Sequence, residues 1–144
     1  MVDVPQFRSD TLAFVERHRV EGPRYRYSVE SFRPTLYSSC YAVMTRSLYN
    51  DLGGLMPDER AAWAAYLNAH QEDDGLYRDD VIFDQGWYAG DPLWCGRPHL
   101  TCHVIIALTA LGATAPKEFR LAAEFREPGR LGEWLESRDW GQRV

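Results

Sequence analysis

The chain has 144 residues, a formal net charge of −5 and a hydrophobic content of 45%. This length suits a single domain, and the hydrophobic content is enough for a core, which argues against an intrinsically disordered chain. The acidic balance and the lack of a basic tract argue against a nucleic-acid partner, and no apolar run reaches the roughly 18–20 residues of a membrane span.

The N-terminal part of the sequence predicts two helices with a polar connection between them. Residues 8–20 have an amphipathic pattern, Ser9 or Asp10 can cap its start, and a Gly-Pro pair ends it. Residues 23–33 are polar and rich in tyrosine. Residues 35–50 are strongly apolar and predict a helix that is buried on most sides.

A third helix is predicted over residues 57–70, because a proline starts it and acidic residues occupy its first turn. A polar turn follows over residues 71–77. Residues 78–97 then form a long loop that contains large aromatic side chains. Loops of this length are often functional, so this segment is a candidate for a binding role.

The C-terminal part predicts one long apolar helix and two short ones. Residues 99–112 are the most hydrophobic stretch and should be buried on most sides, and residues 117–126 and 130–138 form the short helices. Cys40 and Cys102 lie in apolar helices, so both should be buried and inert thiols.

Two sequence stretches occur nearly twice. The first pair is Arg33-Pro34-Thr35-Leu36 with Arg97-Pro98-His99-Leu100. In the second pair, Phe14-Val15-x-x-His18 precedes Gly22-Pro23-Arg24-Tyr25, and Tyr66-Leu67-x-x-His70 precedes Gly75-Leu76-Tyr77. Repetition on this scale predicts stacked helix pairs, each with a buried inner helix and a half-exposed outer one. The units are approximately residues 8–33, 34–80 and 97–144 of one helical-repeat domain, residues 1–144.

The polar turn carries a family resemblance. Gln71-Glu72-Asp73-Asp74-Gly75-Leu76-Tyr77 resembles the Gln-x-x-Asp-Gly-aromatic turn of the α/α-toroid superfamily, which includes squalene–hopene cyclases, other terpene cyclases and prenyltransferase β-subunits. His99-Leu100-Thr101 is similar to the start of an inner helix in that superfamily. The resemblance implies an all-α fold of stacked helical hairpins that forms part of a toroid, and a turn that braces neighbouring helices.

The chemistry of that superfamily is less visible in the sequence than its scaffold. Glu72-Asp73-Asp74 departs from the Asp-x-Asp-Asp acid motif of the cyclases, and the zinc ligands of the prenyltransferases come from a part of the ring that this chain lacks. The resemblance therefore implies the fold and leaves the reaction open.

Four residues are candidates for catalysis. His99 and His103 lie four positions apart on a predicted helix, so both rings project from one face and can serve as acid and base. Asp84 and Asp91, in the preceding loop, can supply paired carboxylates. A zinc site that adds Cys95 or a loop aspartate is conceivable, but no Cys-x-x-Cys or His-Glu-x-x-His pattern supports it, so we expect no metal and no cofactor.

Four further residues are candidates for substrate binding. Trp87, Tyr88 and Trp94 can line an apolar pocket or stack on sugar rings, and Arg97 can bind an anionic group. The competing interpretations are structural: the aromatic residues anchor the loop, and Arg97 pairs with acids of the adjoining turn. The two histidines can likewise be purely structural.

Two functions remain open from the sequence. The first is an enzyme that acts on an isoprenoid-like or glycan-like small molecule in a cavity at the inner-helix starts. The second is a non-catalytic helical-repeat module, or a fragment, that binds a protein partner or forms a homo-oligomer. No signal-peptide pattern is visible and the three cysteines have no disulfide spacing, so we expect a cytoplasmic protein.

Overall fold

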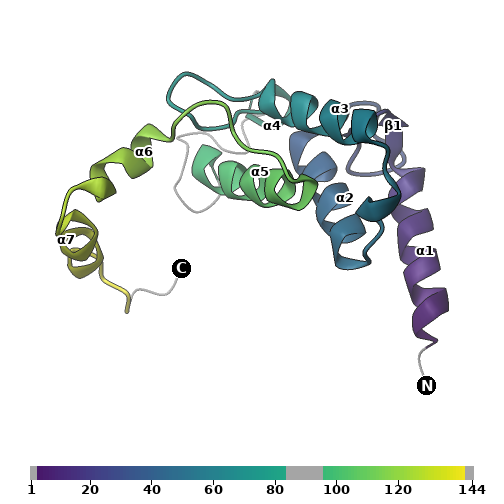
Figure 1. The fold of residues 1–144 in the computed structure, drawn as a ribbon, viewed down its shortest axis with the longest axis horizontal. Helices are drawn as coiled ribbons and strands as arrows, with labels where there is room; N and C mark the ends of the chain where they lie inside the picture. The colour runs from purple at the N-terminus through teal and green to yellow at the C-terminus, as the bar shows by residue number, and fades with distance from the viewer. Residues whose placement is uncertain (1–2, 84–95, 142–144) are drawn as a thin grey trace.

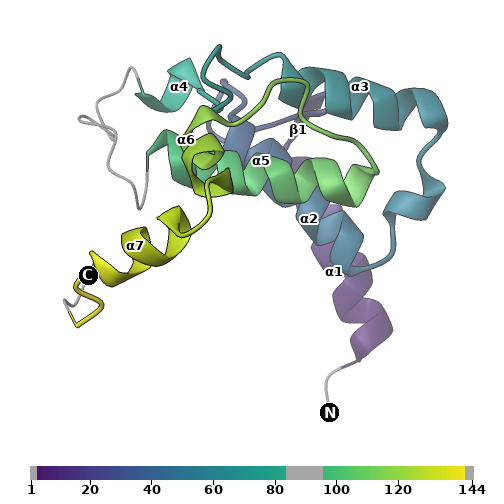
Figure 2. The same cartoon turned by 60° about the vertical axis from the view of Figure 1, so that its left-hand side comes forward.

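The computed structural model describes residues 3–83 and 96–141, and it is mostly helical with one small antiparallel hairpin (Figures 1 and 2). The elements are α1 (Val4–Arg17), β1 (Arg19–Glu21), β2 (Arg24–Tyr25), α2 (Leu36–Leu48), η1 (Leu52–Gly54), α3 (Pro57–Asn68), α4 (Asp80–Phe83), α5 (Arg97–Leu111), α6 (Arg120–Ala123), η2 (Glu124–Arg126) and α7 (Arg130–Glu136).

Helices α2 and α5 lie side by side and run parallel. Tyr37 near the start of α2 contacts His99 near the start of α5, and Tyr41 contacts His103 one turn further along both helices. Helix α3 packs on α5 and α1 packs on α2, whereas α6 and α7 extend away from this body in Figure 1, and α7 also does so in Figure 2. The α2/α5 pair is therefore the centre of the fold.

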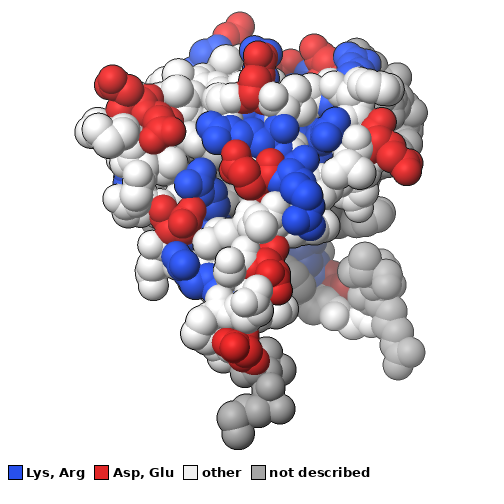
Figure 3. Space-filling view, turned by 90° about the vertical axis from the view of Figure 1, so that its right-hand side faces the viewer, with Lys and Arg blue, Asp and Glu red and all other residues white. Residues whose placement is uncertain are grey.

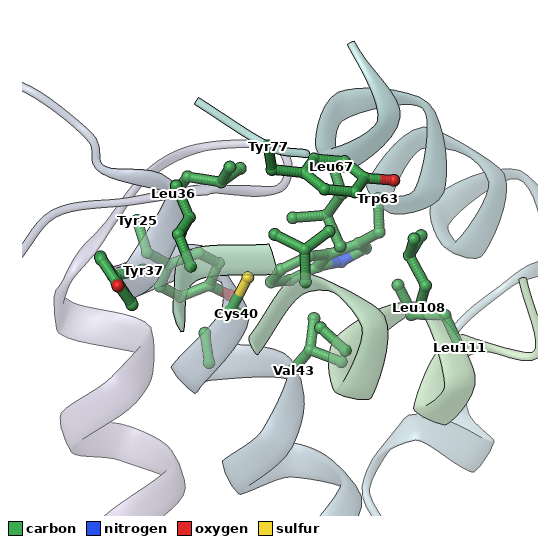
Figure 4. Packing of buried hydrophobic residues seen from close by; sticks show 14 of the residues in the cluster. Tyr25, Leu36, Tyr37, Cys40, Val43, Trp63, Leu67, Tyr77, Leu108 and Leu111 are labelled. Carbon is green, nitrogen blue, oxygen red and sulfur yellow. The ribbon is translucent and has the colours of Figure 1, made fainter. Parts of the chain in front are cut away.

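The core lies between the α2/α5 pair, α3 and the turns that join them. Tyr25 from β2 stacks on Trp63 from α3 with ring centres 5.3 Å apart, and both are buried together with Cys40 of α2 (Figure 4). Burial of large aromatic rings contributes most per residue to a small core, so these rings fix where α3 sits on the pair.

Several predicted boundaries differ from the observed ones. Helix α1 begins at Val4 instead of residue 8, because the Asp3 carboxylate accepts the N–H of Gln6 and caps the helix there; Ser9 and Asp10 are not its caps. The predicted polar connection over residues 23–33 contains strand β2, and the predicted loop over residues 78–97 contains the short helix α4.

The second repeated stretch of the sequence, which ends at Tyr25 in one copy and at Tyr77 in the other, corresponds to a repeated set of contacts. In the first copy the Tyr25 N–H donates to Ser39 Oγ of α2 (3.1 Å), and in the second the Tyr77 N–H donates to Thr101 Oγ1 of α5 (2.9 Å). Both tyrosines are buried. A buried amide without a partner is costly, so each of these bonds holds a turn against a helix of the α2/α5 pair.

The two copies of the first repeated stretch are less alike in the structure. Arg97 is the first residue of α5, whereas Arg33 lies ahead of α2, whose N-cap is Thr35. The Thr35 hydroxyl accepts the N–H of Ser38 at 3.1 Å, which satisfies one amide of the first turn. The two arginines therefore occupy different positions relative to their helices.

The turn at residues 71–77 braces the segment that precedes α6, whereas the expected partners of this turn were neighbouring helices. The Gln71 side-chain amide donates to the carbonyl groups of Gly75 (2.8 Å) and Lys117 (2.9 Å), and its oxygen accepts the Lys117 N–H (2.8 Å). The Arg120 N–H donates to the carbonyl oxygen of Asp74. The turn needs a glycine because Gly75 has φ +88° and its Cα faces the backbone of Glu118 directly.

One side of α5 is more exposed than the sequence predicts. Cys102, Ile105 and Ile106 are exposed, so the expectation of a helix buried on most sides and of a buried Cys102 thiol is wrong. Cys40 on α2 is buried as expected. The difference arises because the described elements cover α5 only where it faces α2 and α3.

Replacing Gly75 by alanine should destabilise the fold strongly. A Cβ there would overlap the Glu118 carbonyl group and lie 2.8 Å from Phe119 Cα, besides the strain of a positive φ. We expect the free energy of unfolding in urea to fall by about 3 kcal/mol. Gly22→Ala is the matched control: φ is +45° but nothing lies within 4 Å, so the loss should be about 1 kcal/mol. An equal loss of unfolding free energy in the two variants would contradict the close approach of the Glu118 backbone to Gly75.

Candidate functional site

A pocket of about 700 Å³ lies at the N-terminal ends of α2 and α5. The connection between β2 and α2 forms one wall, and α2, α4 and the first turn of α5 form the other. Its lining residues are Tyr27, Ser28, Glu30, Ser31, Phe32, Arg33, Thr35, Tyr37, Tyr41, Val81, Ile82 and His99. This size is typical of small-molecule sites; half of the lining residues are aromatic tyrosine or phenylalanine or aliphatic, and most of the pocket surface is apolar.

A buried carboxylate holds two helices of one pocket wall, α2 and α4, together. Asp79, only 3% exposed, accepts the Leu36 N–H at the start of α2 (2.6 Å) and the Val81 N–H at the start of α4 (3.0 Å). Both are first-turn amides that lack a partner within their own helix. Residues next to these two amides line the pocket, so Asp79 fixes how α2 and α4 lie relative to each other in this wall.

Burial raises the pKa of Asp79 above its ordinary value of 3.8, while the hydrogen bonds from Leu36 and Val81 act in the opposite direction. The burial effect is the larger because the interior disfavours the charged form of the carboxyl group.

Tyr37 and His99 make a close polar contact at the pocket. The phenol oxygen of Tyr37 lies 2.7 Å from Nδ1 of His99, which joins α2 to α5 across the pair. Burial lowers the pKa of His99 below its ordinary value of 6.5, and the nearby His103 lowers it further. A neutral imidazole next to a phenol can accept or donate a proton, so the arrangement is suited to acid–base chemistry and to binding one polar group.

His103 and Tyr41 repeat this contact one turn along the helices. Nε2 of His103 lies 3.4 Å from the Tyr41 phenol oxygen, and Nδ1 lies 2.9 Å from the carbonyl oxygen of His99. The two imidazole rings are 4.5 Å apart between centres. The two histidines predicted from the sequence are thus brought together, and only His99 is among the residues that line the pocket.

Arg97 lies at the outer turn. Its guanidinium donates to the carboxylates of Glu72 and Asp74, and its side chain is largely buried. Arg97 thus makes the contact expected from the structural interpretation, in which it pairs with acids of the adjoining turn. Arg33, which aligns with Arg97 in the repeated sequence, lines the pocket and forms no ion pair with any described residue.

Five of the predicted site residues lie outside the described part of the chain. They are Asp84, Trp87, Tyr88, Asp91 and Trp94, and the same holds for Cys95. Their predicted roles in catalysis and substrate binding stay predictions.

Of the twelve lining residues, only His99 was among the predicted site residues; those that sequence reasoning missed include Phe32, Tyr37 and Tyr41. Tyr37 and Tyr41 occur four positions apart, like the two histidines, and this matching spacing was the available signal. Phe32 gave no local signal, because its place at the pocket depends on how the connection between β2 and α2 folds.

Comparisons and searches over the chain gave negative results. No protein-family model, curated protein or solved structure matches the chain. Among the described residues, no helix is both long and apolar enough to cross a membrane. The same part of the chain holds no group of three or more His, Cys, Asp and Glu side chains suited to a metal ion.

Removing the Asp79 charge should change how stability depends on pH. A carboxyl group with a raised pKa in the folded state favours folding when protonated; this contribution is complete below pH 3.8 and is lost as the pH rises through the raised value. Wild type should therefore gain stability relative to Asp79→Asn as the pH falls from 7 toward 4, measured by urea unfolding at each pH.

The control for this series is Asp58→Asn, which removes an exposed carboxylate from the first turn of α3. The Asp58 control should not reproduce the trend. A stability difference between wild type and Asp79→Asn that does not change with pH, or that favours wild type more at neutral pH, would contradict a raised pKa of Asp79 in the folded protein.

Proposed function

We propose that this chain binds an isoprenoid-like, mainly hydrocarbon molecule in the pocket at the starts of α2 and α5. The observation that carries the proposal is the exposure of Phe32: this side chain is 92% exposed and lines the same pocket as Tyr27 and Tyr37. A phenylalanine left in water at the edge of an apolar pocket gains free energy when a hydrocarbon covers it. The ligand thus completes a surface that the chain alone leaves open.

The chemistry of the lining favours a hydrocarbon over a glycan. Val81 and Ile82 of α4 present aliphatic surface, and Glu30 is the one carboxylate among the described lining residues. Glycoside hydrolysis generally uses two carboxylates that flank the scissile bond. The contact between Tyr37 and His99 offers a place for one oxygen of the ligand, such as the hydroxyl of a prenyl alcohol.

The scaffold is proposed to be part of an α/α toroid. Two observations support this. The α2/α5 pair is parallel, and each member receives a hydrogen bond from the buried tyrosine amide of the preceding turn. A parallel layer of helices held by equivalent turns fits an array built from repeated helix pairs. In such an array the pocket would lie at the end of the layer where the helices start.

The test is ligand binding by fluorescence or calorimetry, with farnesol as the isoprenoid probe and maltotriose as the glycan probe. Farnesol should bind and maltotriose should not. Phe32→Ala should weaken farnesol binding about tenfold, equivalent to ~1.4 kcal/mol, because a ring that covers the ligand is lost.

The matched control is Phe7→Ala. Phe7 is an exposed phenylalanine on α1, next to Arg8, which bonds the Tyr49 carbonyl beyond the far end of α2. Phe7→Ala should leave the affinity unchanged. Binding of maltotriose alone, or equal losses in both variants, would contradict an apolar site at this pocket.

A second candidate function is self-association through α5. Its exposed side carries Cys102, Ile105 and Ile106, and no Asp, Glu, Lys or Arg occurs from residue 98 to residue 116. An exposed apolar helix face without charges is typical of a surface that another chain covers.

Sedimentation velocity over a concentration series tests this second function. The mass of the wild type should rise with concentration, and Ile106→Glu should keep the chain monomeric because a buried unpaired charge is costly. Val4→Glu, at an exposed apolar position on α1, is the control and should still associate. A wild type that stays monomeric at every concentration would exclude the second function.

A further inference from the structure

We propose that His99 and His103 bind a divalent transition-metal ion beside the pocket, with the phenol oxygen of Tyr41 as a third donor. This goes beyond the binding of an apolar molecule, because it needs no organic ligand. The histidines lie one turn apart on α5, on the side that faces Tyr37 and Tyr41 of α2. Imidazole nitrogen is a preferred donor for zinc, copper and nickel.

The hydrogen bonds of His103 decide which of its nitrogens is available. Nδ1 lies 2.9 Å from the backbone carbonyl oxygen of His99, and a carbonyl oxygen only accepts. Nδ1 of the neutral ring therefore carries the hydrogen, and Nε2 carries the lone pair. The contact from Nε2 to Tyr41 is long, at 3.4 Å, so a metal ion can replace it at small cost.

His99 can present the same nitrogen. Its Nδ1 is 2.7 Å from the Tyr37 phenol oxygen, and Nε2 has no hydrogen-bond partner among the described residues. A phenol oxygen both donates and accepts, so Tyr37 accepts the Nδ1–H when Nε2 binds an ion. Metal-bound histidines commonly donate their other ring N–H to an oxygen in this way, and here both rings have that oxygen in place.

The spacing of the rings suits one shared ion. Zinc binds each imidazole nitrogen at about 2.0–2.1 Å, so two nitrogens on one tetrahedral ion lie about 3.3 Å apart. The ring centres lie 4.5 Å apart, and two histidines four positions apart on one helix face are a known arrangement for holding one zinc ion. Tyr41 lies with its ring centre 5.3 Å from that of His103, close enough for its oxygen to join them.

This donor set leaves a position on the ion for water or for an added ligand. Two nitrogens and one phenol oxygen occupy three of the four positions of a tetrahedral shell, and an open position is the feature of catalytic rather than structural zinc sites. Because His99 lines the pocket, an ion held here lies next to the bound molecule.

The experiment is a titration of the full chain with Zn²⁺ by calorimetry, and with Co²⁺ by visible absorption. One ion per chain should bind, and Co²⁺ should give an absorption band that Zn²⁺ removes. The double variant His99→Gln/His103→Gln should weaken Zn²⁺ binding more than about tenfold. The chain has four histidines, so His18→Gln/His70→Gln is a matched control that should leave the affinity unchanged.

Tyr37→Phe keeps the ring and its packing but removes the oxygen that orients His99, so it should weaken Zn²⁺ binding about tenfold even if the double histidine variant folds poorly. The far-ultraviolet circular dichroism of Tyr37→Phe should match that of the wild type. Undiminished Zn²⁺ affinity in Tyr37→Phe, loss of affinity in the His18/His70 control, or absence of a Co²⁺ band would overturn the proposal.

Discussion

The buried carboxylate of Asp79 is the constraint on which the pocket depends. A carboxylate removed from water has to be hydrogen-bonded, and Asp79 is bonded by backbone amides at the starts of two helices, α2 and α4. These amides need an acceptor as much as the carboxylate needs donors. The mutual requirement places the start of α2 against α4 and leaves the space between them and the β2–α2 connection open.

The charges elsewhere on the surface are arranged differently: the face that carries α1 and the hairpin mixes both signs in short-range ion pairs such as Arg19–Glu16 and Arg24–Glu21 (Figure 3).

The parts of the fold that were predictable from the sequence are those with local chemistry. Pro57 opens α3 and Gly75 takes a positive φ in its turn, because both conformations are dictated by the residue itself. The hairpin and α4 were not predicted. They depend on contacts far apart in the chain, such as the stacking of Tyr25 on Trp63, that no local pattern shows. The toroid implied by the family resemblance stays a proposal.

The candidate site was likewise predictable only where local spacing defines it. Helical spacing was enough to pair His99 with His103, but their partners Tyr37 and Tyr41 could be found only once α2 and α5 were placed side by side and parallel. The exposure of Cys102 was missed because an apolar sequence records a preference for burial without showing whether a neighbour is present to cover it. The proposed metal ion and an isoprenoid-like ligand would be neighbours, since two of the three proposed metal donors, His99 and Tyr41, also line the pocket.

The central claim is that the starts of α2 and α5 form a binding site, and a crystal structure of the chain with bound farnesol tests it most directly. The account predicts electron density for the hydrocarbon between Phe32, Tyr37 and Ile82, with the hydroxyl group at His99. Farnesol bound elsewhere, for example along the exposed side of α5, or α2 and α5 without the Tyr37–His99 contact, would contradict it.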